Sequence, residues 1–145
     1  MTTPVADYNG IGVTGFHHNI GPSREGMILD VDTVDQTESV NLKVDAAGNV
    51  LRTWNLADIV SAAMIAGGDD PILFVYPAPT DWFHNNACAY RSSDNSLVVS
   101  SRANFVIAID YDSGNISGFW AIRLGRDWIF SRTVHETLYE ILFLN

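Results

Sequence analysis

The chain has 145 residues, 47% of them apolar, and it carries 17 acidic against 8 basic side chains for a net charge of −9. This length fits a single domain over residues 1–145, and the apolar fraction is sufficient for a hydrophobic core. The negative charge argues against nucleic acid and anionic membrane partners, and no apolar run approaches the roughly 20 residues of a membrane span.

At the N-terminus, neither the basic nor the apolar region of a signal peptide is found, so none is predicted and the compartment stays open. Residues 15–54 then alternate short apolar runs with turn residues, which predicts a first blade of four short strands. The turn before the last strand contains Gly48, and that strand closes on Trp54. His17-His18 opens the blade, and later strands are predicted at Met27–Asp32, Val40–Asp45 and Val50–Trp54.

Residues 55–80 have a different pattern, which predicts a helix followed by an irregular loop. Asn55 is a good N-cap, and Asp58 stands three residues on, as in a capping box. Gly67-Gly68 is expected to end the helix, and three prolines follow in the loop. One helical face collects the apolar side chains Leu56, Ile59, Val60, Ala63 and Met64. The segment is predicted to be an insertion between blades.

Residues 81–120 predict a second blade with the same order of strands and turns. Asp94-Asn95 and Asp112-Ser113-Gly114 supply two of its turns. The strands are predicted at Asn86–Tyr90, Ser96–Ser101, Asn104–Asp110 and Asn115–Trp120. Residues 121–145 match neither blade, and Ser131–Leu144 fits either a helix or an apolar strand.

The two predicted blades are related by a constant offset in sequence. His18 and His84 differ by 84 − 18 = 66 positions, and Trp54 and Trp120 by 120 − 54 = 66 positions. Four short antiparallel strands in each repeat are typical of propeller blades. The sequence therefore predicts an all-β fold with one inserted helix, built from β-propeller-like blades that form an incomplete propeller.

Three groups in the repeat are candidates for chemistry. The innermost strand of each propeller blade lines a shared axis, so His18 and His84 at equivalent positions should converge there, with Arg102 at the end of the next strand. Two imidazoles and a guanidinium suit a tetrahedral oxyanion. Because the net charge repels anions, such a site depends on local cations. The competing interpretation is that each histidine is a partly buried polar residue with a satisfied hydrogen bond.

The same residues resemble the bacterial arylsulfate sulfotransferase family. Gly15-Phe16-His17-His18-Asn19-Ile20 resembles its His-His motif. Asp81-Trp82-Phe83-His84-Asn85-Asn86 resembles the start of a second signature of the family. Residues 94–102 and Ile109-Asp110 with Gly114 resemble the rest of that signature. The resemblance covers about residues 15–122.

The resemblance implies a six-bladed propeller that transfers a sulfuryl group from an aryl sulfate to a phenol. The transfer passes through a transiently sulfated histidine, without a nucleotide donor or another cofactor. It assigns catalytic support to His18 (or His17), His84 and Arg102. Around the sulfuryl group it places His17, Asn85 and Asn86 as substrate-binding residues.

The family's nucleophilic histidine belongs to a later blade. His135 is the only later histidine, and its surroundings do not match the nucleophile motif. This chain is therefore expected to supply binding groups without the nucleophile. Two blades also leave strand edges and an apolar face uncovered. Either the chain is a truncated piece, or copies form a homo-oligomer in which three chains complete six blades.

Two other functions remain open at this point: a noncatalytic binding or interaction module derived from a propeller, and a small β-rich domain whose repeat is coincidental. No metal site is predicted. Acidic residues at Asp30, Asp32, Asp35 and Glu38 do not match a calcium loop and are interpreted as turn residues. Trp54 and Trp120 are expected to be packing residues, and Cys88 a small buried residue.

Overall fold

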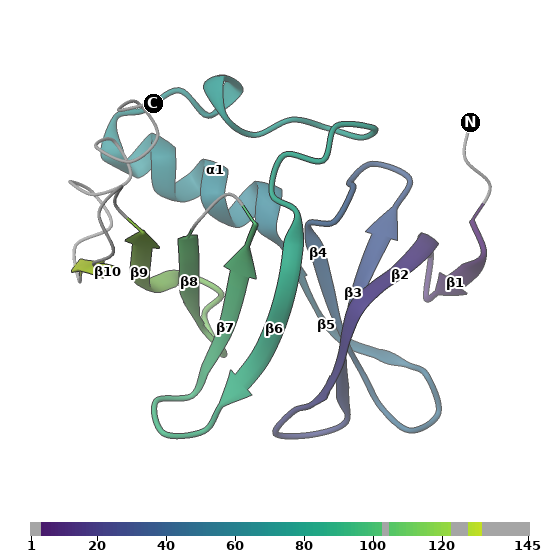
Figure 1. The fold of residues 1–145 in the computed structure, drawn as a ribbon. Coiled ribbons are helices and arrows are strands. Elements are labelled where there is room, and N and C mark those ends of the chain that lie inside the picture. Colours follow the sequence, from purple (N-terminus) through teal and green to yellow (C-terminus); the bar gives the residue numbers. More distant parts are fainter. Residues whose placement is uncertain (1–3, 103–104, 123–127, 132–145) are drawn as a thin grey trace.

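The computed structural model describes residues 4–102, 105–122 and 128–131. These residues form two antiparallel sheets and one α-helix (Figure 1). The first sheet contains β1 (Ala6–Tyr8), β2 (Ile11–Pro22), β3 (Met27–Thr33), β4 (Val40–Val44) and β5 (Val50–Asn55), in that order. The second contains β6 (Asn85–Arg91), β7 (Ser96–Ser101), β8 (Phe105–Asp110), β9 (Ile116–Ile122) and β10 (Trp128–Ser131). The all-β class with blade-like antiparallel sheets in an incomplete propeller is confirmed.

Each sheet contains the four predicted strands and one more. β1 pairs with the start of β2, and β10 pairs with β9. The repeated turns also match: Asp45 accepts hydrogen bonds from backbone amides before β5, and Asp110 does so before β9. Each turn has a glycine at positive φ, Gly48 at 85° and Gly114 at 82°. The repeat therefore reflects the same hairpin, built twice.

The inserted helix α1 (Leu56–Gly67) begins and ends where the sequence predicts. The Asn55 side chain accepts a hydrogen bond from the amide of Ala57 at 3.0 Å. Gly68 adopts the left-handed conformation and donates its amide to the carbonyl of Ile65. A short 3-10 helix, η1 (Pro71–Leu73), follows. In the described part of the chain, no helix has the length and apolar character needed to cross a bilayer.

The apolar side chains form two clusters. The larger cluster lies between the sheets and α1, which runs along one end of the second sheet (Figure 1). It contains Trp54, as predicted, together with Val60 and Met64 of the helix. The smaller cluster belongs to the first sheet alone and consists of Val13, Leu29, Val31, Val40, Leu42 and Val44.

The two sheets meet through their first long strands. β6 lies beside β2 and β3 at the centre of the fold (Figure 1). Asn19 on β2 donates hydrogen bonds to the carbonyl and the sulfur of Cys88 on β6. Arg52 of β5 donates to the carbonyl of Asp112, between β8 and β9 of the other sheet, at 2.8 Å. β2 and β6 are thus adjacent, as expected for neighbouring inner strands.

Gly26, in the β2–β3 turn, is predicted to be essential for the hairpin. Its φ is +76°, and an added Cβ would lie 2.0 Å from the carbonyl oxygen of Val44. We expect Gly26→Ala to lower the free energy of unfolding by at least about 3 kcal/mol. Gly10 is the matched control, because its φ is +87° but nothing lies within 4 Å of its Cβ position.

Gly10→Ala should cost only the conformational term of about 1 kcal/mol. Urea unfolding of the two variants measures both effects. Equal destabilisation by the two substitutions would contradict the packing argument for Gly26.

Cys88 is predicted to be unreactive in the folded protein. Its side chain is buried, as expected from the sequence, and burial raises the pKa of its thiol to about 11. The thiolate that attacks thiol reagents is therefore scarce at pH 8. We expect a colorimetric disulfide reagent to label the native chain far more slowly than the denatured chain, and rapid labelling of the native chain would contradict this burial.

Candidate functional site

The His-His motif lies in an unusually wide bulge of β2. Phe16 pairs with Val31 and Ile20 pairs with Leu29, so three residues of β2, at positions 17–19, stand opposite the single residue Asp30 of β3. In a regular strand, neighbouring side chains point to opposite faces of the sheet. A bulge interrupts this alternation and changes the direction of side chains without ending the strand. It allows His17 and His18 to approach the same junction.

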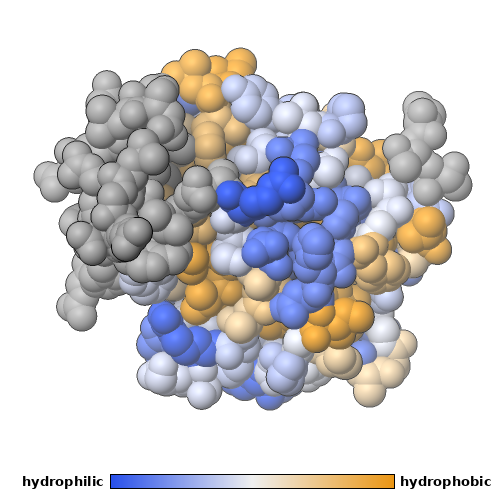
Figure 2. Space-filling model, in the orientation of Figure 1, coloured by the Kyte–Doolittle hydropathy of each residue, from blue (hydrophilic) through white to orange (hydrophobic). Residues whose placement is uncertain are grey.

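His84 reaches the junction from the other sheet. It stands just before β6, with φ at 49°, and its carbonyl accepts a hydrogen bond from the amide of Arg102 at 3.1 Å. The ring centroids of His18 and His84 lie 6.2 Å apart, and those of His17 and His18 lie 6.0 Å apart. Two residues at equivalent repeat positions therefore converge. The centre of this face is hydrophilic, with apolar patches beside it (Figure 2).

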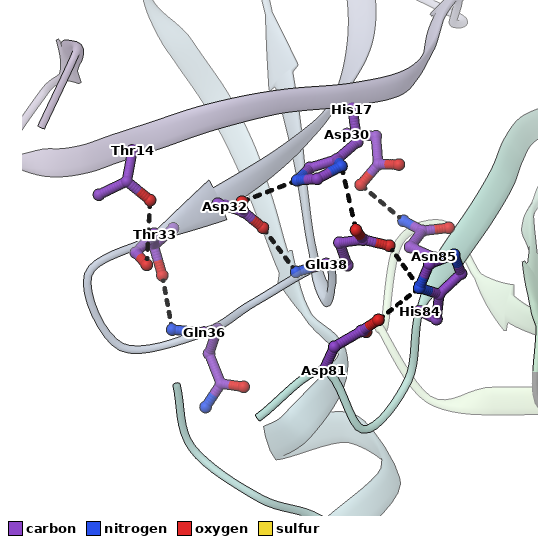
Figure 3. Close-up of polar contacts among 10 residues, drawn as sticks. All are labelled: Thr14, His17, Asp30, Asp32, Thr33, Gln36, Glu38, Asp81, His84 and Asn85. Carbon is purple, nitrogen blue, oxygen red and sulfur yellow. Dashed lines mark hydrogen bonds and ion pairs between the residues drawn. The ribbon is translucent and has the colours of Figure 1, made fainter. Parts of the chain in front are cut away.

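Carboxylates contact two of the three imidazoles, those of His17 and His84, and Glu38 lies between these two rings (Figure 3). Its Oε1 is 3.3 Å from Nδ1 of His17, and its Oε2 is 2.9 Å from Nδ1 of His84. Oδ2 of Asp32 lies 2.7 Å from Nε2 of His17, and Asp81 makes a close contact with Nδ1 of His84. Within the described residues, His18 is exposed and its ring makes no hydrogen bond or ion pair.

The carboxylates change the protonation of His17. Burial lowers the pKa of His17, but the hydrogen bond and charge of Asp32, together with the charges of Glu38 and Asp30, outweigh it and raise the pKa above its ordinary value. His17 is thus favoured as an imidazolium between two carboxylates. Because both of its ring nitrogens face carboxylates, it serves to hold the site together.

A buried polar network lies behind the histidines. Nδ2 of Asn85 donates to Oδ1 of Asp30 at 3.0 Å and to Oδ1 of Asn41 at 3.1 Å, joining the first strand of one sheet to two strands of the other. Asp30 is 1% exposed. Burial raises the pKa of its carboxyl to about 7, against the opposing charge of His17.

The structure brings some of the predicted site residues together and leaves others apart. His17, His18 and His84 meet at the junction. Asn85 adjoins them but is fully buried, and its amide nitrogen is used within the protein. Arg102 lies next to His84 through its backbone, and its side chain is exposed without a contact to the imidazoles among the described residues. Asn86, the extra residue in the irregular register of β6, is also exposed. His135 lies outside the described residues.

Sequence reasoning missed the acidic partners of the histidines. Asp32 and Glu38 were interpreted as turn residues; Asp32 does accept a hydrogen bond from the amide of Glu38 at 2.7 Å, yet both carboxylates also contact His17. Asp30 and Asp32 occupy alternate positions of β3, and therefore share a face beside the bulge. That alternation opposite a His-His pair is the signal that indicates ion pairing.

Comparison with known proteins agrees with the geometry of the two sheets. The model of the family described as Arylsulfotransferase (ASST) matches residues 6–138. The chain belongs to the arylsulfotransferase family. The family match runs past the second predicted blade and takes in residues 121–138. The comparison with curated proteins found no match to this arylsulfotransferase-family chain.

The buried network makes a stability prediction for two neighbouring asparagines. Asn85→Ala removes the donor that Asp30 and Asn41 share, and should lower the free energy of unfolding by about 1–3 kcal/mol because buried acceptors lose their partner. Asn86→Ala is the matched control, and as an exposed substitution it should change stability by less than about 0.5 kcal/mol. Chemical denaturation of both variants tests this, and an Asn85→Ala protein as stable as the control would contradict it.

Proposed function

We propose that this chain supplies the sulfuryl-binding groups of an arylsulfotransferase-like site, and that the nucleophilic histidine comes from outside it. The substrates are an aryl sulfate and a phenol. His18, His84 and Arg102 would bind the sulfuryl oxygens, with His17, Asn85 and Asn86 around them. The observation that carries the proposal is the 6.2 Å separation of the His18 and His84 rings, which come from different sheets of an arylsulfotransferase-family chain.

The orientation of His84 supports a binding role. Its Nδ1 faces the carboxylates of Glu38 and Asp81, which favours a proton on that nitrogen. Nε2 is then the nitrogen left for a ligand, and in the imidazolium form it can donate a hydrogen bond to a sulfuryl oxygen. His18 is exposed and free of ion pairs among the described residues, so its ring is available to the same ligand. The Arg102 side chain is exposed beside them and provides a fixed set of donors for an oxyanion.

The proposed reaction is the one that the resemblance to the family implies. The nucleophilic histidine attacks sulfur, an N–S bond forms, and the S–O bond to the aromatic ring breaks, so that the phenolate leaves and takes up a proton. A second phenol then attacks the sulfur, loses its proton, and releases the histidine. In each step the binding groups stabilise the negative charge on the sulfuryl oxygens. A ring of three chains is the assembly that would complete six blades.

A noncatalytic binding or interaction module is the second candidate function. It is favoured by the acidic surroundings of the imidazoles, since Asp32, Glu38 and Asp81 all contact histidines. These carboxylates oppose the approach of a sulfate ester. A chain that retained the scaffold without turnover would tolerate this arrangement.

The proposal predicts acceptor-dependent release of a coloured phenol from its sulfate ester by the purified full chain. His84→Ala and Arg102→Ala should each reduce the rate by at least about a hundredfold, the usual effect of losing one group that stabilises transition-state charge.

Arg24→Ala is the control, because Arg24 is exposed and its partners among the described residues, Asp112, Asn95 and the ring of Tyr111, are not site residues. It should leave the rate unchanged. An absence of colour release at high protein concentration would reject the enzyme and favour the noncatalytic module.

A further inference from the structure

The charge of the histidine cluster is unusual for an anion site. Four carboxylates, those of Asp30, Asp32, Glu38 and Asp81, surround or contact the imidazoles. In the described part of the chain, no lysine or arginine forms an ion pair with any of them. Such a cluster attracts cations, and its mixture of nitrogen and oxygen donors is the kind that binds transition metals.

Three donors lie close enough to share one ion. His17, His18 and Glu38 each offer a ligand atom, and these atoms lie within 4.8 Å of one another. Nδ1 of His17 is 3.3 Å from Oε1 of Glu38. Two ligands of a tetrahedral zinc ion, each about 2.0–2.1 Å from the metal, are separated by about 3.4 Å. This pair therefore already has the spacing of zinc ligands, and zinc binding would release the proton from Nδ1 of His17.

Asp32 occupies the position of an orienting partner. Its Oδ2 is 2.7 Å from Nε2 of His17, the ring nitrogen opposite the one that faces Glu38. Histidine ligands of metals usually donate their second ring nitrogen to a carboxylate, which fixes the ring and increases its basicity. The Asp32–His17–Glu38 arrangement has this form (Figure 3).

We propose that His17, His18 and Glu38 bind one divalent transition-metal ion of the zinc type, with Asp32 orienting His17. Two imidazoles and one carboxylate favour zinc over calcium or magnesium, which prefer oxygen ligands. His18 is exposed, so the ion has a path of entry from solvent. Three protein ligands leave a fourth position for water. This site does not depend on sulfuryl transfer.

The buried carboxylate behind the site supports a cation. Asp30 is 1% exposed, and its Oδ2 has no hydrogen-bond partner among the described residues. It stands opposite residues 17–19 of the bulge in β2, which places it beside His17. A dication at His17 and Glu38 would stabilise this buried carboxylate, to which Asn85 is the one hydrogen-bond donor among the described residues.

A neighbouring set shares Glu38 and is the main alternative location. Glu38, Asp81 and His84 also offer ligand atoms within 4.8 Å of one another. This set contains only one imidazole, and its Nδ1 is already contacted by both carboxylates. The first set is therefore the better zinc site, and substitutions that touch only one set distinguish the two.

The test is calorimetric titration of the chelator-treated full chain with zinc chloride, without aryl sulfate. We expect one equivalent to bind, and cobalt(II) to give the visible absorption of a tetrahedral site with nitrogen ligands. His18→Ala should weaken zinc binding by at least tenfold, and Asp32→Asn by about 10–100-fold. Asp81→Asn is the matched control and should leave the affinity unchanged, because Asp81 belongs only to the neighbouring set.

Circular dichroism should show that the variants remain folded, and Glu38→Gln provides a second ligand variant of unchanged shape. Absence of zinc binding by the native chain would overturn the proposal and leave a network of ion pairs. Loss of binding in Asp81→Asn, with full binding in His18→Ala, would overturn the assignment of ligands. Because the readout is binding, a failure here is separate from a failure of turnover.

Discussion

The contacts of Glu38 determine where the histidines lie. Its carboxylate contacts His17 of one sheet and His84 of the other, while its backbone carbonyl accepts the amide of Asn85 at 2.9 Å. Asp32 accepts the amide of Glu38 itself. Glu38 adopts φ of 46°, a conformation that costs a residue with a side chain about 1–2 kcal/mol. This strain is sustained because the residue is fixed by contacts from both sheets, and the two imidazoles keep their positions for the same reason.

The number of ring nitrogens that contact a carboxylate differs among the three histidines. His17 is contacted on both ring nitrogens, His84 on one and His18 on neither within the described residues. Among the described residues, the number of ring nitrogens without a carboxylate contact is therefore lowest in His17, intermediate in His84 and highest in His18. The carboxylates that orient the rings also make the site negative, which opposes an aryl sulfate. A bound dication would offset this charge, so metal binding and sulfuryl binding are compatible in charge, although each is tested separately.

The sequence predicts the repeated parts of the fold better than the irregular ones. Strands, turns and helix ends follow local rules, and Asn55, Gly68 and the Asp45 and Asp110 turns obey them. The convergence of His18 and His84 could be predicted because the repeat places them at equivalent positions. The bulge at residues 17–19 could not, since its register depends on pairing with β3. For the same reason, the contact of Glu38 with both sheets depends on tertiary structure that no local pattern encodes.

Both sheets carry apolar side chains that a further partner could cover. On the first sheet, Val31 and Leu42 belong to a cluster that is buried within one chain. On the second, Val98 and Val106 line a hollow of about 230 Å³ and are only half-buried. In a closed ring, the outer face of each first sheet meets the outer face of a second sheet in the next copy. The first sheet also carries exposed apolar side chains, among them Phe16, Ile20 and Leu51. Ring assembly therefore stays a prediction in which apolar side chains of both sheets would become buried.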